Sequence, residues 1–233
     1  MQNMLSRRAL FHTLACGCAA APAGLFATPV LAAAGPKTSL SGDQALAKLK
    51  EGNATFVTGG ACVPAGGDKI SPLVAGQAPF AVIVGCSDSR VPPELVFSRG
   101  LGELFTVRVA GNTVDRSALG SISYGVMVLG APLVVVLGHE NCGAVEAAVS
   151  IVTKKTKYPG SIGDMVRPIL PAVLQARKAG GELVAASVRA NVARVVAQLK
   201  KSEPAITDPL KQNHLKIVGG VYDLASGAVA FVA

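Results

Sequence analysis

Four near-continuous apolar runs, rich in β-branched residues, constrain the fold of this chain most strongly. They span residues 80–86, 104–109, 133–138 and 215–221. Runs of this kind are typical of strands that are buried on both faces, as in parallel sheets. Helical periodicity occupies residues 117–129, 144–153, 162–178 and 183–200. The alternation predicts an α/β fold in which a central, mainly parallel β-sheet is flanked by helices and joined by right-handed crossovers.

Each end of the predicted domain adds one more element. Residues 41–57 have helical periodicity, and Ser41 is placed to cap that helix. A glycine- and proline-rich segment then ends the helix and contains Cys62, which we interpret as a spare thiol or as a thiol that pairs between chains. Residues 227–232 follow a turn and are predicted to form an antiparallel hairpin with the strand that ends near Tyr222.

Residues 1–34 have the composition of an export signal. A twin arginine at residues 7–8 stands just before an apolar run, and small residues at the end of the run form a cleavage site after Ala32 or Ala34. A twin arginine is an address that an export receptor recognises, not a membrane anchor. We therefore expect residues 35–233 to form a single periplasmic domain that has no stable association with the membrane after cleavage.

Two alternatives for this segment are weaker. An uncleaved membrane anchor is disfavoured because Pro22 and Pro29 interrupt the apolar stretch. Attachment of a lipid to Cys16 or Cys18 is disfavoured because the residues before each cysteine fit such a site poorly. Export in a folded state would also let a metalloprotein load its metal before its thiols meet an oxidising compartment.

The composition argues against binding to nucleic acids or nucleotides. The formal net charge is +8, and removal of the two arginines at residues 7–8 leaves +6. The basic residues are scattered, the sequence has no tryptophan, and it contains no helix-turn-helix or zinc-finger motif. No glycine-rich phosphate-binding pattern follows a predicted strand. A small-molecule substrate is therefore a better expectation than a nucleic acid.

Metal-ligating residues stand where two of the predicted strands end. Cys86 closes the first apolar run and His139 follows the third, and open α/β sheets bind ligands outside the carboxyl ends of their strands. Cys142 lies three residues after His139 at the entry to a helix, so the two side chains can converge. Two thiolates and one imidazole favour zinc, and three protein ligands leave a fourth position for water. His214 has no cysteine or acid near it in the sequence, so we interpret it as an ordinary histidine.

An acid and a base follow Cys86 at intervals of two residues. In an extended segment Asp88 and Arg90 therefore share one side with Cys86. The fourth zinc ligand is then either Asp88 or a water molecule. If it is water, zinc lowers its pKa from 15.7 to about 7. Asp88 would then turn away, pair with Arg90 and accept a hydrogen bond from the zinc-bound hydroxide.

Each of these features has a simpler explanation when it is taken alone. Cys86 and Cys142 could be buried thiols or could form a disulfide, and Asp88 and Arg90 could form an ordinary surface ion pair. Their joint occurrence at two strand ends of one sheet favours a zinc site.

The two stretches, Cys86-Ser-Asp88-Ser-Arg90 and His139-Glu-Asn-Cys142, resemble the paired signature of the β-class carbonic anhydrases. The resemblance extends through most of residues 41–150 and includes the segments 89–92, 102–105, 108–112 and 138–144. It implies that Cys86, His139 and Cys142 are the zinc ligands and that Asp88 and Arg90 form the catalytic dyad. The implied reaction is the reversible hydration of carbon dioxide to bicarbonate and a proton.

The resemblance also implies a substrate pocket at a subunit interface of a homodimer or tetramer. The positions that match this pocket are Gln77, Phe105, Ala110, Tyr124 and Gly143. Gln77 would donate a hydrogen bond to bicarbonate, while Phe105 and Ala110 would form an apolar wall for carbon dioxide. By the same resemblance, the helix at residues 41–57 is expected to pack on the partner subunit.

The sequence departs from the family pattern at two positions. Some members are switched off by bicarbonate that a tryptophan, an arginine and a tyrosine hold together. Arg108 and Tyr124 match two of these residues, but Ile83 stands at the tryptophan position, so we expect the directly active form. Ala110 stands where a larger aliphatic residue is common, which changes the expected shape of the pocket.

Two other functions remain open at this point. A hydrolase of carbonyl sulfide or carbon disulfide would use the same fold and zinc site with a changed access path. A non-catalytic zinc-binding protein would need neither Asp88 nor Arg90, so the presence of both argues against it.

Overall fold

The computed structural model of the protein describes residues 35–60 and 70–232. Within them, one sheet has the strand order β2-β1-β3-β4-β5. The strands from β2 to β4 in this order run parallel, and β5 is antiparallel to β4. This confirms the predicted α/β fold with its C-terminal antiparallel strand. The strands are β1 (Ala81–Gly85), β2 (Leu104–Arg108), β3 (Leu133–His139), β4 (Lys216–Tyr222) and β5 (Val229–Val232).

Helices and short 3₁₀ segments connect the strands. The predicted export signal and Cys62 lie outside the described residues. Among the described residues, no helix has both the length and the apolar character needed to cross a membrane. The helices are α1 (Gly42–Val57), α2 (Pro93–Val96), α3 (Arg116–Met127), α4 (Gly143–Lys154), α5 (Gly160–Val166), α6 (Leu170–Ala179), α7 (Leu183–Leu199) and α8 (Pro204–Lys211), and the 3₁₀ segments are η2 (Ser71–Ala75), η3 (Ala110–Asn112) and η4 (Arg167–Ile169).

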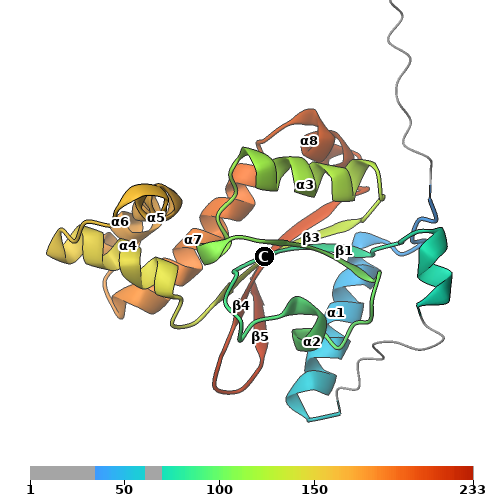
Figure 1. The fold of residues 1–233 in the computed structure, drawn as a ribbon, viewed down its shortest axis with the longest axis horizontal. Helices are drawn as coiled ribbons and strands as arrows, with labels where there is room; N and C mark the ends of the chain where they lie inside the picture. The colour runs from blue at the N-terminus through green and yellow to red at the C-terminus, as the bar shows by residue number, and fades with distance from the viewer. Residues whose placement is uncertain (1–34, 61–69, 233) are drawn as a thin grey trace, which may run out of the picture. The chain divides into compact units, whose positions relative to one another are not determined.

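The sheet is covered by helices on both faces (Figure 1). Helices α3, α7 and α8 pack over one face, and α1 and α2 pack over the other. Because successive side chains of a strand point to opposite faces, Val82 and Val84 of β1 enter the first core while Ala81 and Ile83 enter the second. This double burial explains why the strands are continuously apolar in sequence.

Helix α1 begins at a complete capping box. Ser41 accepts a hydrogen bond from the Gln44 backbone, and the Gln44 side chain accepts one from the Ser41 backbone. Its buried residues Ala45 and Leu49 pack on the sheet of the same chain. Asn53 further ties the helix to the β4–β5 hairpin, because its side chain accepts a hydrogen bond from the Val229 N–H. Contact of α1 with a partner subunit remains a prediction.

The helix predicted at residues 162–178 is divided in the structure. Pro168 lies within η4, between α5 and α6. Proline has no N–H to donate and its ring clashes with the preceding turn, so a regular α-helix is kinked or broken at this position. The structure also contains two helices that were not predicted from the sequence. They are α2 and α8, which begin at Pro93 and Pro204, a residue type that suits the first position of a helix.

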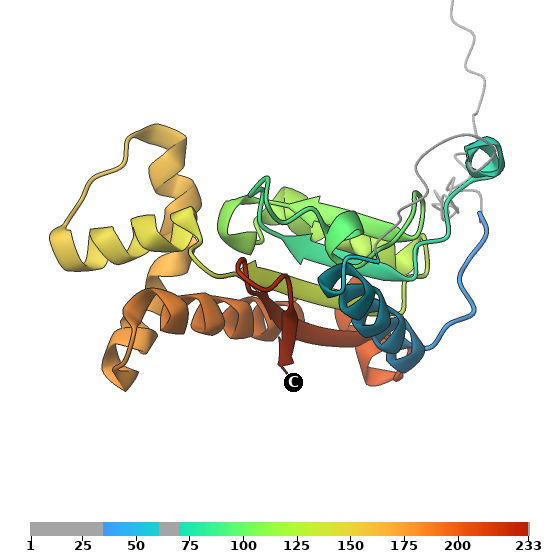
Figure 2. The same ribbon diagram turned by 90° about the horizontal axis from the view of Figure 1, so that it is seen from below.

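Helices α4, α5 and α6 lie together on one side of the molecule, away from α1 (Figure 2). Helix α4 starts just after β3 ends, so this group lies at the carboxyl ends of the parallel strands. A third apolar cluster forms there, and it contains Cys86 and Cys142 together with Val145, Ile169 and Val188. The fold therefore places both thiols at the same edge of the sheet.

Candidate metal centre

Two neighbouring strand ends and one helix start bring Cys86, His139 and Cys142 together. Strands β1 and β3 pair in parallel, so Cys86, just after β1, lies near His139, the last residue of β3. Asn141 adopts a left-handed conformation with φ of 50°, which asparagine tolerates. The chain thereby turns between β3 and α4 and places Cys142 at the N-cap position of that helix.

The three side chains present their ligand atoms to a common point. One ligand atom from each residue lies within 4.8 Å of the others, and the two sulfur atoms are 4.0 Å apart. Cys86 is 5% exposed, Cys142 is 1% exposed and His139 is fully buried. Two sulfurs and one nitrogen at this separation match the donor set that zinc prefers.

The histidine ring has one nitrogen that is paired and one that is not. Nδ1 of His139 lies 2.8 Å from the Glu140 carbonyl oxygen, which only accepts, so Nδ1 carries the proton. Nε2 then keeps a free lone pair, and this buried atom has no hydrogen-bond partner among the described residues. An unpaired buried acceptor is costly, and a metal ion between Nε2 and the two sulfurs would satisfy it. The residues therefore fit a zinc ion.

The environment of the two sulfurs favours negative charge on one of them. The Cys142 thiol and the Gly111 N–H, which lies 3.2 Å from the Cys86 sulfur, hold the pKa of Cys86 well below its ordinary value despite burial. The Cys86 sulfur in turn raises the pKa of Cys142. Cys86 is therefore the more easily deprotonated thiol of the pair, and a thiolate is the form that binds a metal.

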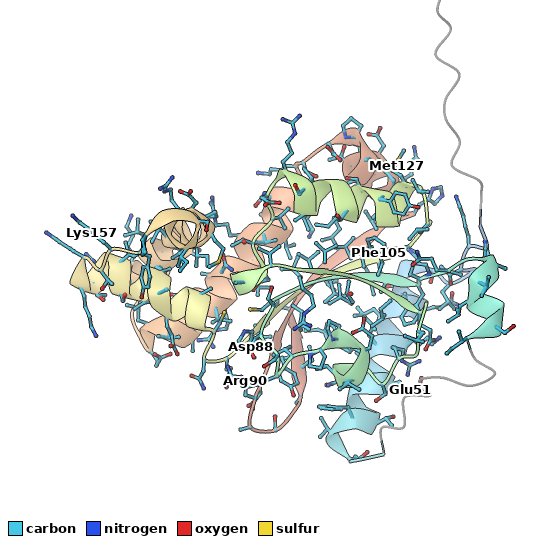
Figure 3. The ribbon with its side chains drawn as sticks, in the orientation of Figure 1. Glu51, Asp88, Arg90, Phe105, Met127 and Lys157 are labelled. Carbon is cyan, nitrogen blue, oxygen red and sulfur yellow. The ribbon has the colours of Figure 1, made fainter. Side chains whose placement is uncertain are left out.

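Asp88 and Arg90 form a two-pronged ion pair beside the cluster (Figure 3). Arg90 Nε donates to Asp88 Oδ1 at 2.9 Å and Nη2 donates to Oδ2 at 2.7 Å. This guanidinium holds the pKa of Asp88 well below its usual range. Asp88 Oδ2 also lies 3.8 Å from His139 Nε2, so the ionised carboxylate borders the point on which the ligand atoms converge.

Arg108 holds the backbone of the segment that carries this pair. Its Nε donates to the Cys86 carbonyl at 2.9 Å, and its Nη2 donates to the Asp88 carbonyl at 2.6 Å. The sequence gives no signal for this role, because it depends on β2 lying next to β1. Ile83, at the position where a tryptophan would complete a bicarbonate switch, is fully buried in the second core.

The five predicted pocket residues fall into two groups. Ala110 and Gly143 adjoin the candidate metal centre. Ala110 precedes Gly111, whose N–H contacts the Cys86 sulfur, and Gly143 follows Cys142. Gln77 and Tyr124 line a different hollow of about 300 Å³. Phe105 packs on Tyr124, with ring centroids 6.1 Å apart, and Figure 3 shows it below α3, apart from Asp88 and Arg90. None of the three candidate metal ligands is among the described residues that line this hollow.

Fold and site together define an α/β protein with a candidate metal centre of two cysteines and one histidine at its strand ends. Known proteins with similar sequences identify the family within this class. The carbonic anhydrase family matches residues 81–229. A carbonic anhydrase of Mycolicibacterium smegmatis is 43% identical over 182 residues, which cover 78% of this chain and 88% of the relative. Carbonic anhydrase 2 of Mycobacterium tuberculosis is 44% identical over 180 residues, covering 77% and 87%.

Structural comparison gives the same result. The β-carbonic anhydrase CcaA superimposes with a TM-score of 0.64 at 26% identity, covering 71% of this chain and 85% of that one. The β-carbonic anhydrase CafA of Aspergillus fumigatus gives a TM-score of 0.63 at 27% identity, covering 82% and 89%. The chain belongs to the β-class carbonic anhydrase family, and it is an enzyme with carbonic anhydrase activity.

Proposed function

We propose that Cys86, His139 and Cys142 bind one zinc ion and that the protein uses it to hydrate carbon dioxide reversibly. In the forward reaction a bond forms between a water oxygen and the carbon, and a proton leaves, giving bicarbonate. The observation that carries the proposal is the buried Nε2 of His139, which lacks a partner among the described residues, on a ring that has a nitrogen within 4.8 Å of both sulfurs. When bound, zinc supplies a Lewis acid that lowers the pKa of water toward about 7.

The residues around the cluster have distinct roles in this proposal. Asp88, kept ionised by Arg90, accepts a hydrogen bond from the attacking water and orients it toward the carbon. The Glu140 carbonyl fixes the tautomer of His139, so that Nε2 faces the metal. Arg108 keeps the Cys86–Arg90 segment in place through its two carbonyl contacts. Because Asp88 is already paired with Arg90, this arrangement supports the directly active form.

The test combines zinc analysis with stopped-flow measurement of carbon dioxide hydration, on protein purified under reducing conditions. We expect one zinc per chain, and Asp88→Asn should keep the zinc while hydration falls by about 100-fold or more. The matched control is Asp164→Asn. Asp164 also pairs with an arginine, Arg167, at 3.1 Å, but that pair is highly exposed on α5 and η4.

Three outcomes would contradict the proposal. If the purified protein contains no zinc, the three residues do not form a zinc site. If Asp88→Asn hydrates carbon dioxide as fast as wild type, the Asp88 carboxylate has no role in the reaction. Zinc-containing protein that hydrolyses carbonyl sulfide or carbon disulfide but does not hydrate carbon dioxide would assign the site to the alternative hydrolase.

We also propose that the active form is a homodimer or tetramer, in which a second copy covers the β2 edge and completes the substrate pocket. Tyr124 is 45% exposed and Met127 is 58% exposed on α3, which packs beside this edge strand. Sedimentation velocity should show an oligomer that Met127→Lys weakens. Ile162→Lys, at a residue of similar exposure on α5, is the control and should have no effect. A monomeric and fully active wild type would overturn this proposal.

Export to the periplasm remains a proposal that rests on the sequence of residues 1–34. Fractionation of cells that express the full chain should place it in the periplasm. Replacement of Arg7 and Arg8 by lysine should retain it in the cytoplasm. Continued export of that variant would exclude the twin-arginine route.

A further inference from the structure

A backbone N–H of the turn after β2 points at one of the proposed metal ligands. Gly111 N lies 3.2 Å from the Cys86 sulfur. Gly111 has φ of 70°, in the left-handed region that favours glycine. A Cβ at this position would lie 2.6 Å from Ile169 Cδ1 and 3.1 Å from Ala144 Cβ. The conformation that delivers this N–H to the sulfur therefore favours glycine at residue 111.

A side chain of α7 forms a hydrogen bond with the carbonyl group of this glycine. Asn191 of α7 donates from Nδ2 to the Gly111 carbonyl oxygen at 2.8 Å, across 80 residues of sequence. Asn191 is 2% exposed, and its helix neighbours Val188 and Val192 belong to apolar cores. Burial of an amide among apolar side chains is unfavourable unless it is hydrogen-bonded. The bond to Gly111 thus explains how an asparagine is accommodated on the buried face of α7.

We propose that Asn191 is a positioning residue of the metal centre, which holds Gly111 so that its N–H donates to the Cys86 thiolate. The inference rests on the proposed ligation of zinc by Cys86. An N–H···S hydrogen bond to a ligating thiolate fixes the direction of the sulfur lone pairs and reduces the charge that the sulfur donates to the metal. Loss of such outer contacts weakens metal binding by about 10- to 100-fold in metalloproteins generally.

The test compares Asn191→Leu and Asn191→Ala with the control Ser187→Ala. Ser187 lies one turn earlier on α7, is fully buried, and its Oγ has no hydrogen-bond partner in the described part of the chain. Competition with a chelator gives the zinc dissociation constant, and the absorption spectrum of cobalt-substituted protein gives the sulfur-to-cobalt charge-transfer band. We expect about 10-fold weaker zinc binding and a shifted band in both Asn191 variants, with neither change in Ser187→Ala.

The outcomes separate this inference from the proposed function. Wild-type protein that binds no zinc overturns both. Wild-type protein that binds zinc, with folded Asn191 variants of equal affinity and unchanged cobalt spectrum, overturns the positioning role alone. If neither variant folds, ¹¹³Cd-substituted wild-type protein decides by NMR. Scalar coupling between cadmium and the Gly111 amide proton would support the N–H···S bond that Asn191 is proposed to hold, and its absence would overturn the proposal.

Discussion

The ion pairs at the two ends of the sheet differ in the sequence separation of their partners. At the amino ends of the strands, Lys48 of α1 pairs with Glu103 at 2.7 Å across 55 residues of sequence. Asp43 of the same helix pairs with Lys216, the first residue of β4, across 173 residues. At the carboxyl ends, Asp88 and Arg90 pair across only two residues.

This difference separates pairs that hold the fold from a pair that is available for chemistry. The pairs at the amino ends fasten α1 to the strands, so their loss would affect stability. The Asp88–Arg90 pair connects no two elements, and its carboxylate lies 3.8 Å from His139 Nε2. We therefore expect changes at the carboxyl ends to affect activity strongly and changes at the amino ends to affect mainly stability.

The largest effect is expected from His139→Ala, with His214→Ala as its matched control. His139 is fully buried and is one of the proposed zinc ligands, whereas His214 is exposed and follows α8. Zinc analysis should show loss of the metal in His139→Ala, and hydration of carbon dioxide should fall to background. His214→Ala should retain both. If His214→Ala also lost zinc, the loss in His139→Ala could not be assigned to a missing zinc ligand.

A smaller effect is expected from Arg90→Lys. Lysine keeps the positive charge, but it cannot make the two parallel hydrogen bonds that fix the orientation of Asp88. We expect kcat to fall by about 10-fold, with zinc content and thermal stability unchanged. Arg167→Lys, in the exposed pair with Asp164, should leave kcat unchanged. Equal kcat in Arg90→Lys would mean that charge alone, without the two-pronged geometry, is sufficient.

The carboxyl-end site could be predicted because short-range sequence determines it. Cys86 and His139 follow directly from two strand ends, and parallel strands bring their carboxyl ends to one edge. Asp88, Arg90 and Cys142 lie within four residues of those anchors. The strands were also predictable, because double burial leaves a continuous apolar run. The placement of the ligands thus follows from local pattern and one rule of topology.

Contacts made over long sequence separations could not be predicted. Nothing in the sequence of α7 shows that Asn191 would reach Gly111, since this depends on how α7 packs beneath the turn after β2. The role of Arg108 depends in the same way on the pairing of β2 with β1. The break at Pro168 differs, because proline interrupts the backbone hydrogen bonds of a helix without changing the periodicity of the apolar residues around it.

The smallest effect is expected from Glu103→Gln at the amino ends, and it should depend on pH. Burial tends to raise the pKa of Glu103, but the hydrogen bonds from Lys48 and from the Gly100 N–H outweigh it and lower the pKa below its usual value. A lowered folded-state pKa means that the stabilisation is fully present above the unfolded pKa of about 4.3 and is lost as pH falls through the lower folded value. The free energy of unfolding of Glu103→Gln should therefore be about 0.5 kcal/mol lower than that of wild type near pH 7.

Urea unfolding of wild type and Glu103→Gln at several pH values gives this difference. It should stay constant above about pH 5 and shrink at more acidic pH, while carbon dioxide hydration near pH 7 stays unchanged. Asp208→Asn is the control, because Asp208 pairs with Lys211 at 3.6 Å at a highly exposed position within α8 and should contribute almost nothing. A loss of hydration in Glu103→Gln without a loss of stability would contradict the division between the two ends of the sheet. It would show that the contact between α1 and Glu103 affects catalysis at the opposite edge of the sheet.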